Sequence, residues 1–119
     1  MVSESFTPIP SQVAAARHFA IGAAEAIGCC PTDLALVVSE LATNACVHAH
    51  TPFTVSLHRH ESGLLVEVAD DDPRPVTVRP VTTGSSGRGM QIVAAVAKDW
   101  GTSNCGPGGK SVWAVLGCP

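Results

Sequence analysis

The chain has 119 residues, of which 45% are apolar and only 14% are charged. These proportions allow a buried core and exclude a disordered chain, and the length predicts one domain over residues 1–119. The formal charge of −3 and the absence of a basic cluster argue against nucleic-acid binding, because such proteins usually carry a lysine- or arginine-rich face.

The first third of the chain predicts two helices. Residues 1–10 read as an extended arm, and Ser11 is expected to cap a helix that follows Pro10 and ends at Gly28. Thr32 or Asp33 should cap a second helix over residues 34–48. Apolar residues recur at helical spacing in both helices: Val13, Ala16, Ala20, Ala23 and Ile27 in the first, and Leu34, Val37, Val38 and Leu41 in the second.

The rest of the chain predicts a hairpin, a long loop, a third helix and a second hairpin. Apolar and polar residues alternate over residues 53–58 and 64–69, around a turn at residues 61–63. A loop over residues 70–87 precedes a helix that starts after Gly87 and covers residues 88–100. We therefore expect an α+β fold, a two-layer sandwich of three helices against a largely antiparallel or mixed four-stranded sheet.

Two polar residues of the second helix lie beside its apolar stripe. Glu40 and Asn44 are four residues apart, so their side chains share one helix face. A carboxylate at the edge of a buried face can act as a general base, and an asparagine oxygen can bind Mg²⁺. Taken alone, the pair also fits an exposed carboxylate and a polar residue near a helix end.

Two further motifs flank the long loop. Asp70 ends a strand, where its carboxylate can accept a hydrogen bond from an exocyclic amine, although Asp-Asp-Asp-Pro also favours a turn. Residues 84–89, GSSGRG, precede the third helix, whose N-terminus suits a polyphosphate, with Arg88 as an added contact. A short glycine cluster of this kind is also typical of a flexible linker.

The cysteines and histidines predict neither a disulfide framework nor a zinc site. The five cysteines include no C-x-x-C spacing, so free thiols in a reducing cytosol are expected. The histidines at 48, 50, 58 and 60 lack a cysteine or carboxylate that completes a set. There is no signal peptide pattern and no run of about 20 apolar residues, so the expected location is cytoplasmic, without membrane contact.

Four segments together resemble the histidine-kinase-like ATPase domain, the Bergerat fold, and within it the short anti-sigma-factor serine/threonine kinases. They occur in the family's order: ELATNA at 40–45, VEVADDDPR at 66–74, SGRGMQIV at 86–93 and GGKSVWAVL at 108–116. Each segment is weak alone, whereas four in register are specific, and the first helix fits as well.

The resemblance implies a role for each matching residue. Glu40 would be the general base, Asn44 would hold Mg²⁺ against the triphosphate of ATP, and Asp70 would read the adenine amine. Three residues would border the phosphates at the start of the third helix: Gly87, Arg88 and Gly89. The resemblance also implies a sigma factor and an anti-sigma-factor antagonist as protein partners, and a homodimer that uses the N-terminal helix.

The chain departs from the family pattern at the lid hinge and in the closing strand, and the helix-end residue His48 is followed by Ala49 rather than glycine. Asp72 and Arg74 replace the two glycines expected after Asp70, which predicts a stiffer lid hinge and more negative charge near the nucleotide, and so weaker ATP binding. Lys110 replaces the usual threonine of the closing strand. Ser111 should point to the opposite sheet face, which puts a water-mediated adenine contact in doubt.

Three functions remain open at this stage. The first is a serine/threonine kinase that phosphorylates an anti-sigma-factor antagonist and sequesters a sigma factor when the antagonist is absent. The second is a non-catalytic ATP-binding module that acts through protein contacts, which Asp72, Arg74 and Lys110 favour. The third is an ATPase without a protein acceptor, in which Glu40 would activate water.

Overall fold

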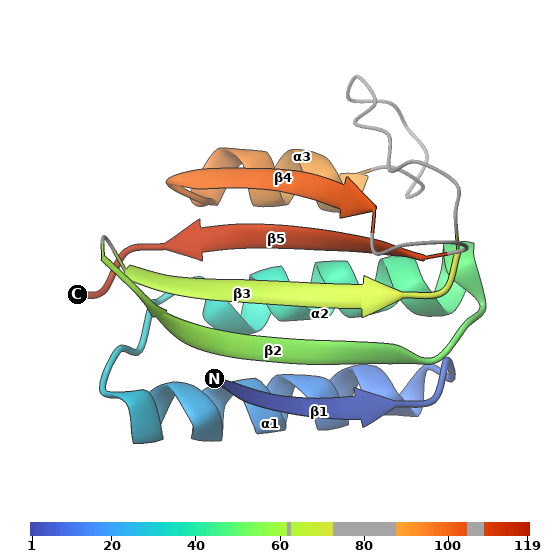
Figure 1. Ribbon diagram of the computed structural model, residues 1–119, viewed down its shortest axis with the longest axis horizontal. Helices are drawn as coiled ribbons and strands as arrows, with labels where there is room; N and C mark the ends of the chain where they lie inside the picture. Colours follow the sequence, from blue (N-terminus) through green and yellow to red (C-terminus); the bar gives the residue numbers. More distant parts are fainter. Residues whose placement is uncertain (62, 73–87, 105–108) are drawn as a thin grey trace.

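The computed structural model describes residues 1–61, 63–72, 88–104 and 109–119, and the side chains of His48, Arg88 and Asn104 lie outside this description. Figure 1 shows one sheet with helices behind it on a single face. The elements in chain order are β1 (Val2–Phe6), α1 (Ser11–Ile27), α2 (Leu34–Asn44), a π-helical turn (Ala45–Ala49), β2 (Phe53–His60), β3 (Gly63–Asp70), α3 (Arg88–Val96), β4 (Asp99–Asn104) and β5 (Lys110–Leu116).

The described sheet has five strands in the order β1-β2-β3-β5-β4, and every neighbouring pair is antiparallel. The predicted α+β architecture is confirmed, with one strand more than the four expected. The extra strand is β1, which pairs with β2 within the segment read as an extended arm. Four of its five residues are exposed, so it lacks the alternation that reveals a half-buried strand.

Helix α1 covers β1 and β2 with small side chains. Ala16, Ala20 and Ala23 are buried as predicted, and Gly28 ends the helix in the left-handed conformation at φ 86°. Ser11 is the first helical residue rather than the cap, because Pro10 occupies the N-cap position without a side-chain hydrogen bond. No helix among the described residues is long and apolar enough to cross a membrane.

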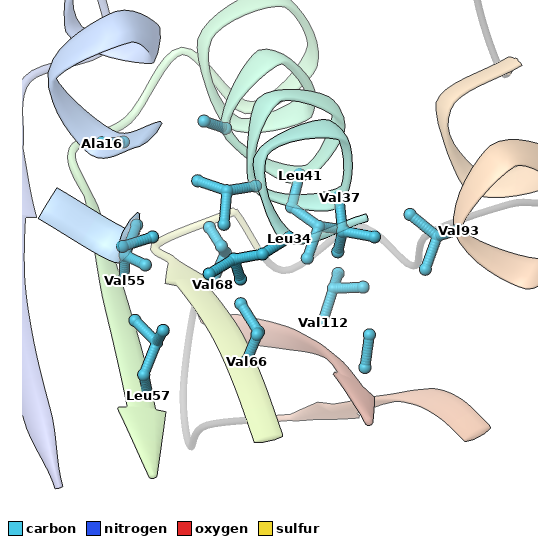
Figure 2. Close-up of a cluster of buried hydrophobic side chains, with 14 of the residues drawn as sticks. Ala16, Leu34, Val37, Leu41, Val55, Leu57, Val66, Val68, Val93 and Val112 are labelled. Carbon is cyan, nitrogen blue, oxygen red and sulfur yellow. The ribbon is translucent and has the colours of Figure 1, made fainter. Parts of the chain in front are cut away.

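Helix α2 lies over β3 and β5, with the predicted apolar stripe against the sheet. Figure 2 shows Leu34, Val37 and Leu41 pointing toward valines and a leucine of the strands, while Val93 of α3 approaches from the side. Val37 and Val93 are completely buried, and Leu34 and Leu41 nearly so. Each such side chain contributes roughly 1.5–3 kcal/mol when buried, so this stripe fixes how α2 lies on the sheet.

The helical segment that begins with α2 ends near His48 as predicted, whereas the end of α3 differs from the prediction. Helix α2 continues into a π-helical turn, and His50 closes it with φ 57° and a backbone hydrogen bond to Ala45 O of 2.9 Å. Helix α3 ends at Val96 rather than at residue 100, because Asp99 and Trp100 begin β4 and pair with Val115 and Ala114. The backbone pairing of the sheet therefore overrides the apolar pattern that seemed to extend the helix.

A disulfide joins Cys29 to Cys118, which corrects the prediction of free thiols. Cys29 follows the glycine cap of α1, and Cys118 follows β5. These two chain positions are 89 residues apart in sequence, but their Cα atoms are 5.2 Å apart, within the range that a disulfide spans. Among the described cysteines, Cys30 is free and exposed, and Cys46 is free and buried.

Candidate functional site

The segments that carry the predicted site residues meet at one end of the sheet. In Figure 1 the end of α2, the end of β3, the start of α3 and the start of β5 all lie at this end, opposite the C-terminus. The antiparallel register explains part of this arrangement, because it sets Asp70 at the end of β3 directly opposite Lys110 at the start of β5. We call this end of the molecule the site end.

Glu40 and Asn44 lie on the last turns of α2 and are half-buried. Val37 and Leu41, beside them on the helix, are buried against the sheet. The pair therefore flanks the apolar stripe as the sequence predicted. This position leaves the carboxylate and the amide accessible to a ligand at the site end.

Asp70 is buried, with an exposed fraction of 9%, although it carries a charge. It shares the helix-covered face of the sheet with Val68, two residues earlier on β3, which belongs to the core. Its Oδ1 atom accepts a hydrogen bond from the backbone N–H of Asp72 at 2.8 Å. The backbone beyond the strand thus holds the carboxylate in a fixed orientation.

Lys110 is the site residue whose role the sequence did not reveal. Its Nζ lies 3.1 Å from Asp70 Oδ1 and 3.4 Å from the carbonyl oxygen of Asp72. The side chains of Lys110 and Asp70 are 11% and 6% exposed, so the ion pair is almost removed from solvent. The signal in the sequence was a lysine in place of the family's threonine, but its partner depends on the strand register.

Ser111 lies on the other face of the sheet, as its place in the strand predicts. It pairs with Ala69 of β3 and Ser103 of β4, and its hydroxyl is buried without a hydrogen-bond partner among the described residues. Ser111 therefore does not replace the threonine that the family pattern places beside the aspartate.

The phosphate-binding prediction is only partly covered by the described residues. Gly87 lies outside them, as do Arg74 and the rest of the lid that the family resemblance implies over residues 73–87, whereas Arg88 and Gly89 form the first turn of α3. Asp72 is described and is buried at 7% exposure, and its backbone N–H donates to Asp70 Oδ1.

The described residues contain no group of three or more histidine, cysteine, aspartate or glutamate side chains able to hold a metal ion. Mg²⁺ has different requirements, because it keeps several waters and takes one or two protein oxygens together with substrate phosphates. The half-buried amide of Asn44, one turn from Glu40, offers a donor set of this kind.

A hollow of about 380 Å³ lies next to the site end but on the bare face of the sheet. Its lining includes Ser5, Thr54 and Ala69, which neighbour one another across β1, β2 and β3. Asp70 also lines the hollow, whereas Glu40 and Asn44 do not, so the hollow reaches the strand end of the predicted site but not the helix that carries its acid–amide pair.

An antiparallel sheet covered by helices on one face, with a buried aspartate at a strand end and an acid–amide pair on a helix above, defines a nucleotide-binding α+β domain. Residues 6–116 match the family model of the histidine kinase-like ATPase domain. This match spans almost the entire chain, and the chain belongs to that family of ATP-binding domains. No curated protein matches the sequence.

Proposed function

We propose that this chain is an ATP-dependent serine/threonine protein kinase that regulates a sigma factor by phosphorylating an anti-sigma-factor antagonist. The observation that carries the proposal is the pair Glu40 and Asn44, one turn apart at the edge of the buried face of α2, at the same end of the sheet as Asp70. The chain belongs to a family of ATP-binding domains, and in such a domain we expect this pair to supply a base and a metal ligand beside the nucleotide.

Each residue has one task in this mechanism. Asp70, held by the Asp72 N–H, accepts a hydrogen bond from the exocyclic amine of adenine. Asn44 would hold Mg²⁺, which would neutralise charge on the phosphates. Glu40 would accept the proton of the substrate hydroxyl as that oxygen forms a bond to the γ-phosphorus, while the bond from the γ-phosphorus to the β,γ-bridging oxygen breaks and ADP leaves.

The choice of protein partners rests on the resemblance to the short anti-sigma-factor kinases. The unphosphorylated antagonist would release the sigma factor, and the kinase would hold the sigma factor when no antagonist is available. This role belongs to the cytoplasm, where transcription takes place, and a homodimer through the N-terminal helix forms part of the same proposal.

A second candidate is a non-catalytic ATP-binding module that acts through protein contacts. The ion pair at Asp70 favours it, because Oδ1 already accepts one bond from the Asp72 backbone and one from Lys110. An adenine amine that binds Oδ1 must share or displace these donors. ATP would then bind more weakly than it would at an aspartate without a counterion.

Transfer of radiolabelled phosphate from ATP to a panel of purified anti-sigma-factor antagonists separates the candidates. The kinase proposal expects transfer to a serine or threonine, loss of transfer in Glu40→Ala, and unchanged ATP affinity in that variant. Glu67→Ala is the matched control, because Glu67 is also half-buried but lies on the bare face of the sheet.

The other outcomes also decide between functions. Full transfer in Glu40→Ala contradicts the role of Glu40. ATP binding without transfer, together with tight binding of a sigma factor or antagonist, supports the module. Phosphate release without an acceptor supports an ATPase.

A further inference from the structure

The nucleobase end of the predicted site holds a charged donor as well as a charged acceptor. Lys110 and Asp70 are directly opposite each other on neighbouring strands, and both lie on the helix-covered face. The ammonium group is 3.1 Å from the carboxylate, and both side chains are largely shielded from solvent. A ligand that reaches Asp70 therefore also meets Lys110.

An ionised carboxylate alone accepts hydrogen bonds and donates none. It matches the 6-amino group of adenine, which is a donor, and it opposes the 6-oxo group of guanine or hypoxanthine, which is an acceptor. A site of this kind rejects 6-oxopurines because two acceptors face each other out of water.

Lys110 changes this pattern. An ammonium group has three N–H donors, and the described residues supply two acceptors for them, Asp70 Oδ1 and, at a longer distance, the carbonyl of Asp72. Among the described residues the third donor has no acceptor, and it can point toward a base. Together the two side chains present a donor beside an acceptor. Adenine matches this pair with its 6-amino group at Asp70 and its N1 at Lys110, and hypoxanthine matches it in a shifted pose, with its 6-oxo group at Lys110 and its N1–H at Asp70.

We propose that Lys110 makes this site accept 6-oxopurine nucleotides alongside ATP. The proposal rests on the proposed role of Asp70 as the base-reading residue, and it assigns to Lys110 the part of a specificity-determining residue. Lys110 removes the repulsion that would otherwise exclude ITP and GTP.

The test compares dissociation constants for ATP and ITP, measured by calorimetry with Mg²⁺, in the wild type and in Lys110→Met. The readout is the ratio of the two constants, because any general loosening of the pocket acts on both nucleotides and cancels. We expect ITP to bind the wild type within about tenfold of ATP, and the ratio to rise by about tenfold or more in Lys110→Met, the range that an unmatched buried polar group produces.

The chain offers a close control, since Lys98 is its only other lysine. Lys98 lies beyond α3 at the opposite end of β5, where its backbone N–H donates to Val115 O. Lys98→Met changes net charge equally and should leave the ratio as in the wild type. Lys110→Arg keeps a cationic donor and should keep the ratio low.

Two results would overturn the inference. One is strong rejection of ITP by the wild type, about a hundredfold or more against ATP; the other is a ratio that Lys110→Met leaves unchanged. If neither nucleotide binds the wild type, the proposed ATP-binding function fails as well, so the two failures are distinguishable. The dissociation constant of GTP then tests whether the pocket also has room for a 2-amino group.

Discussion

The two ends of the sheet are built from opposite kinds of interaction. At the site end, β3 and β5 terminate in a nearly buried ion pair, Asp70 with Lys110. At the far end, the same two strands are joined by Leu64 and Leu116, both buried, and the chain beyond β5 is bonded to the start of the α1–α2 connection through Cys118 and Cys29. Figure 1 places the C-terminus at this far end.

The difference indicates that the far end contributes more to the stability of the fold than the site end does. Covalent closure and apolar packing favour the folded state directly. A buried ion pair contributes little net stability, because desolvation of both charges offsets their attraction. The far end therefore anchors the two elements, α2 and β5, whose other ends carry Glu40, Asn44 and Lys110.

The largest expected effect comes from opening the disulfide. Closure of a loop of 89 residues restricts the unfolded chain by about 4–5 kcal/mol in the chain-entropy account. Cys118→Ser, or a reductant on the wild type, should lower the free energy of unfolding by up to this amount in urea titrations. A reductant should have no further effect on Cys118→Ser, and equal stability of oxidised and reduced wild type would contradict the anchoring role.

The next effect also belongs to the far end. A Cβ atom on Gly63 would overlap the backbone carbonyl oxygen of Leu116, so Gly63→Ala must push β3 and β5 apart. We expect a loss of about 3 kcal/mol, the upper part of the range for overpacking. Gly22→Ala is the control, because nothing lies within 4 Å of its Cβ, and it should stabilise α1 by about 0.5–1 kcal/mol.

At the site end, Asp70→Asn should weaken ATP binding and also cost about 2 kcal/mol of stability, because it leaves the Lys110 ammonium without its charged partner. The double variant Asp70→Asn/Lys110→Met should be more stable than Asp70→Asn alone. Urea titrations of the wild type, Asp70→Asn, Lys110→Met and the double variant give the coupling free energy between the two side chains. Strictly additive losses would show that the two side chains do not depend on each other.

The smallest effect is chemical rather than energetic. Cys30 is exposed, whereas Cys46 is buried, donates its thiol to Ile9 O at 3.6 Å, and has its pKa raised by burial. At neutral pH without reductant, iodoacetamide should label Cys30 rapidly and Cys46 only after unfolding, as read by peptide mass spectrometry. Rapid labelling of Cys29 in the folded protein would contradict the disulfide.

The sequence predicted the helix stripe, both hairpins and the edge position of Glu40 and Asn44, because these follow from local periodicity. It did not predict β1, since a mostly exposed edge strand has no apolar face to reveal it. It misplaced the end of α3, because the pairing of Asp99 and Trp100 with β5 is decided by the sheet.

The same limit applies to the candidate site. The partner of Lys110 and the bond between Cys29 and Cys118 join residues 40 and 89 positions apart. Spacing along one sequence does not show such pairings, because they depend on strand register and on where the chain returns to the sheet. The family motifs supplied the candidate residues, and the structure supplied the ion pair that changes what Asp70 offers to a base.

A crystal structure with Mg²⁺ and a non-hydrolysable ATP analogue tests the central claim most directly. The account predicts the purine against Asp70 and Lys110, the metal at Asn44, and Glu40 facing the terminal phosphate. A nucleotide bound against Ser5 and Thr54 on the bare face of the sheet, away from Glu40 and Asn44, or no bound nucleotide at saturating concentration, would contradict it.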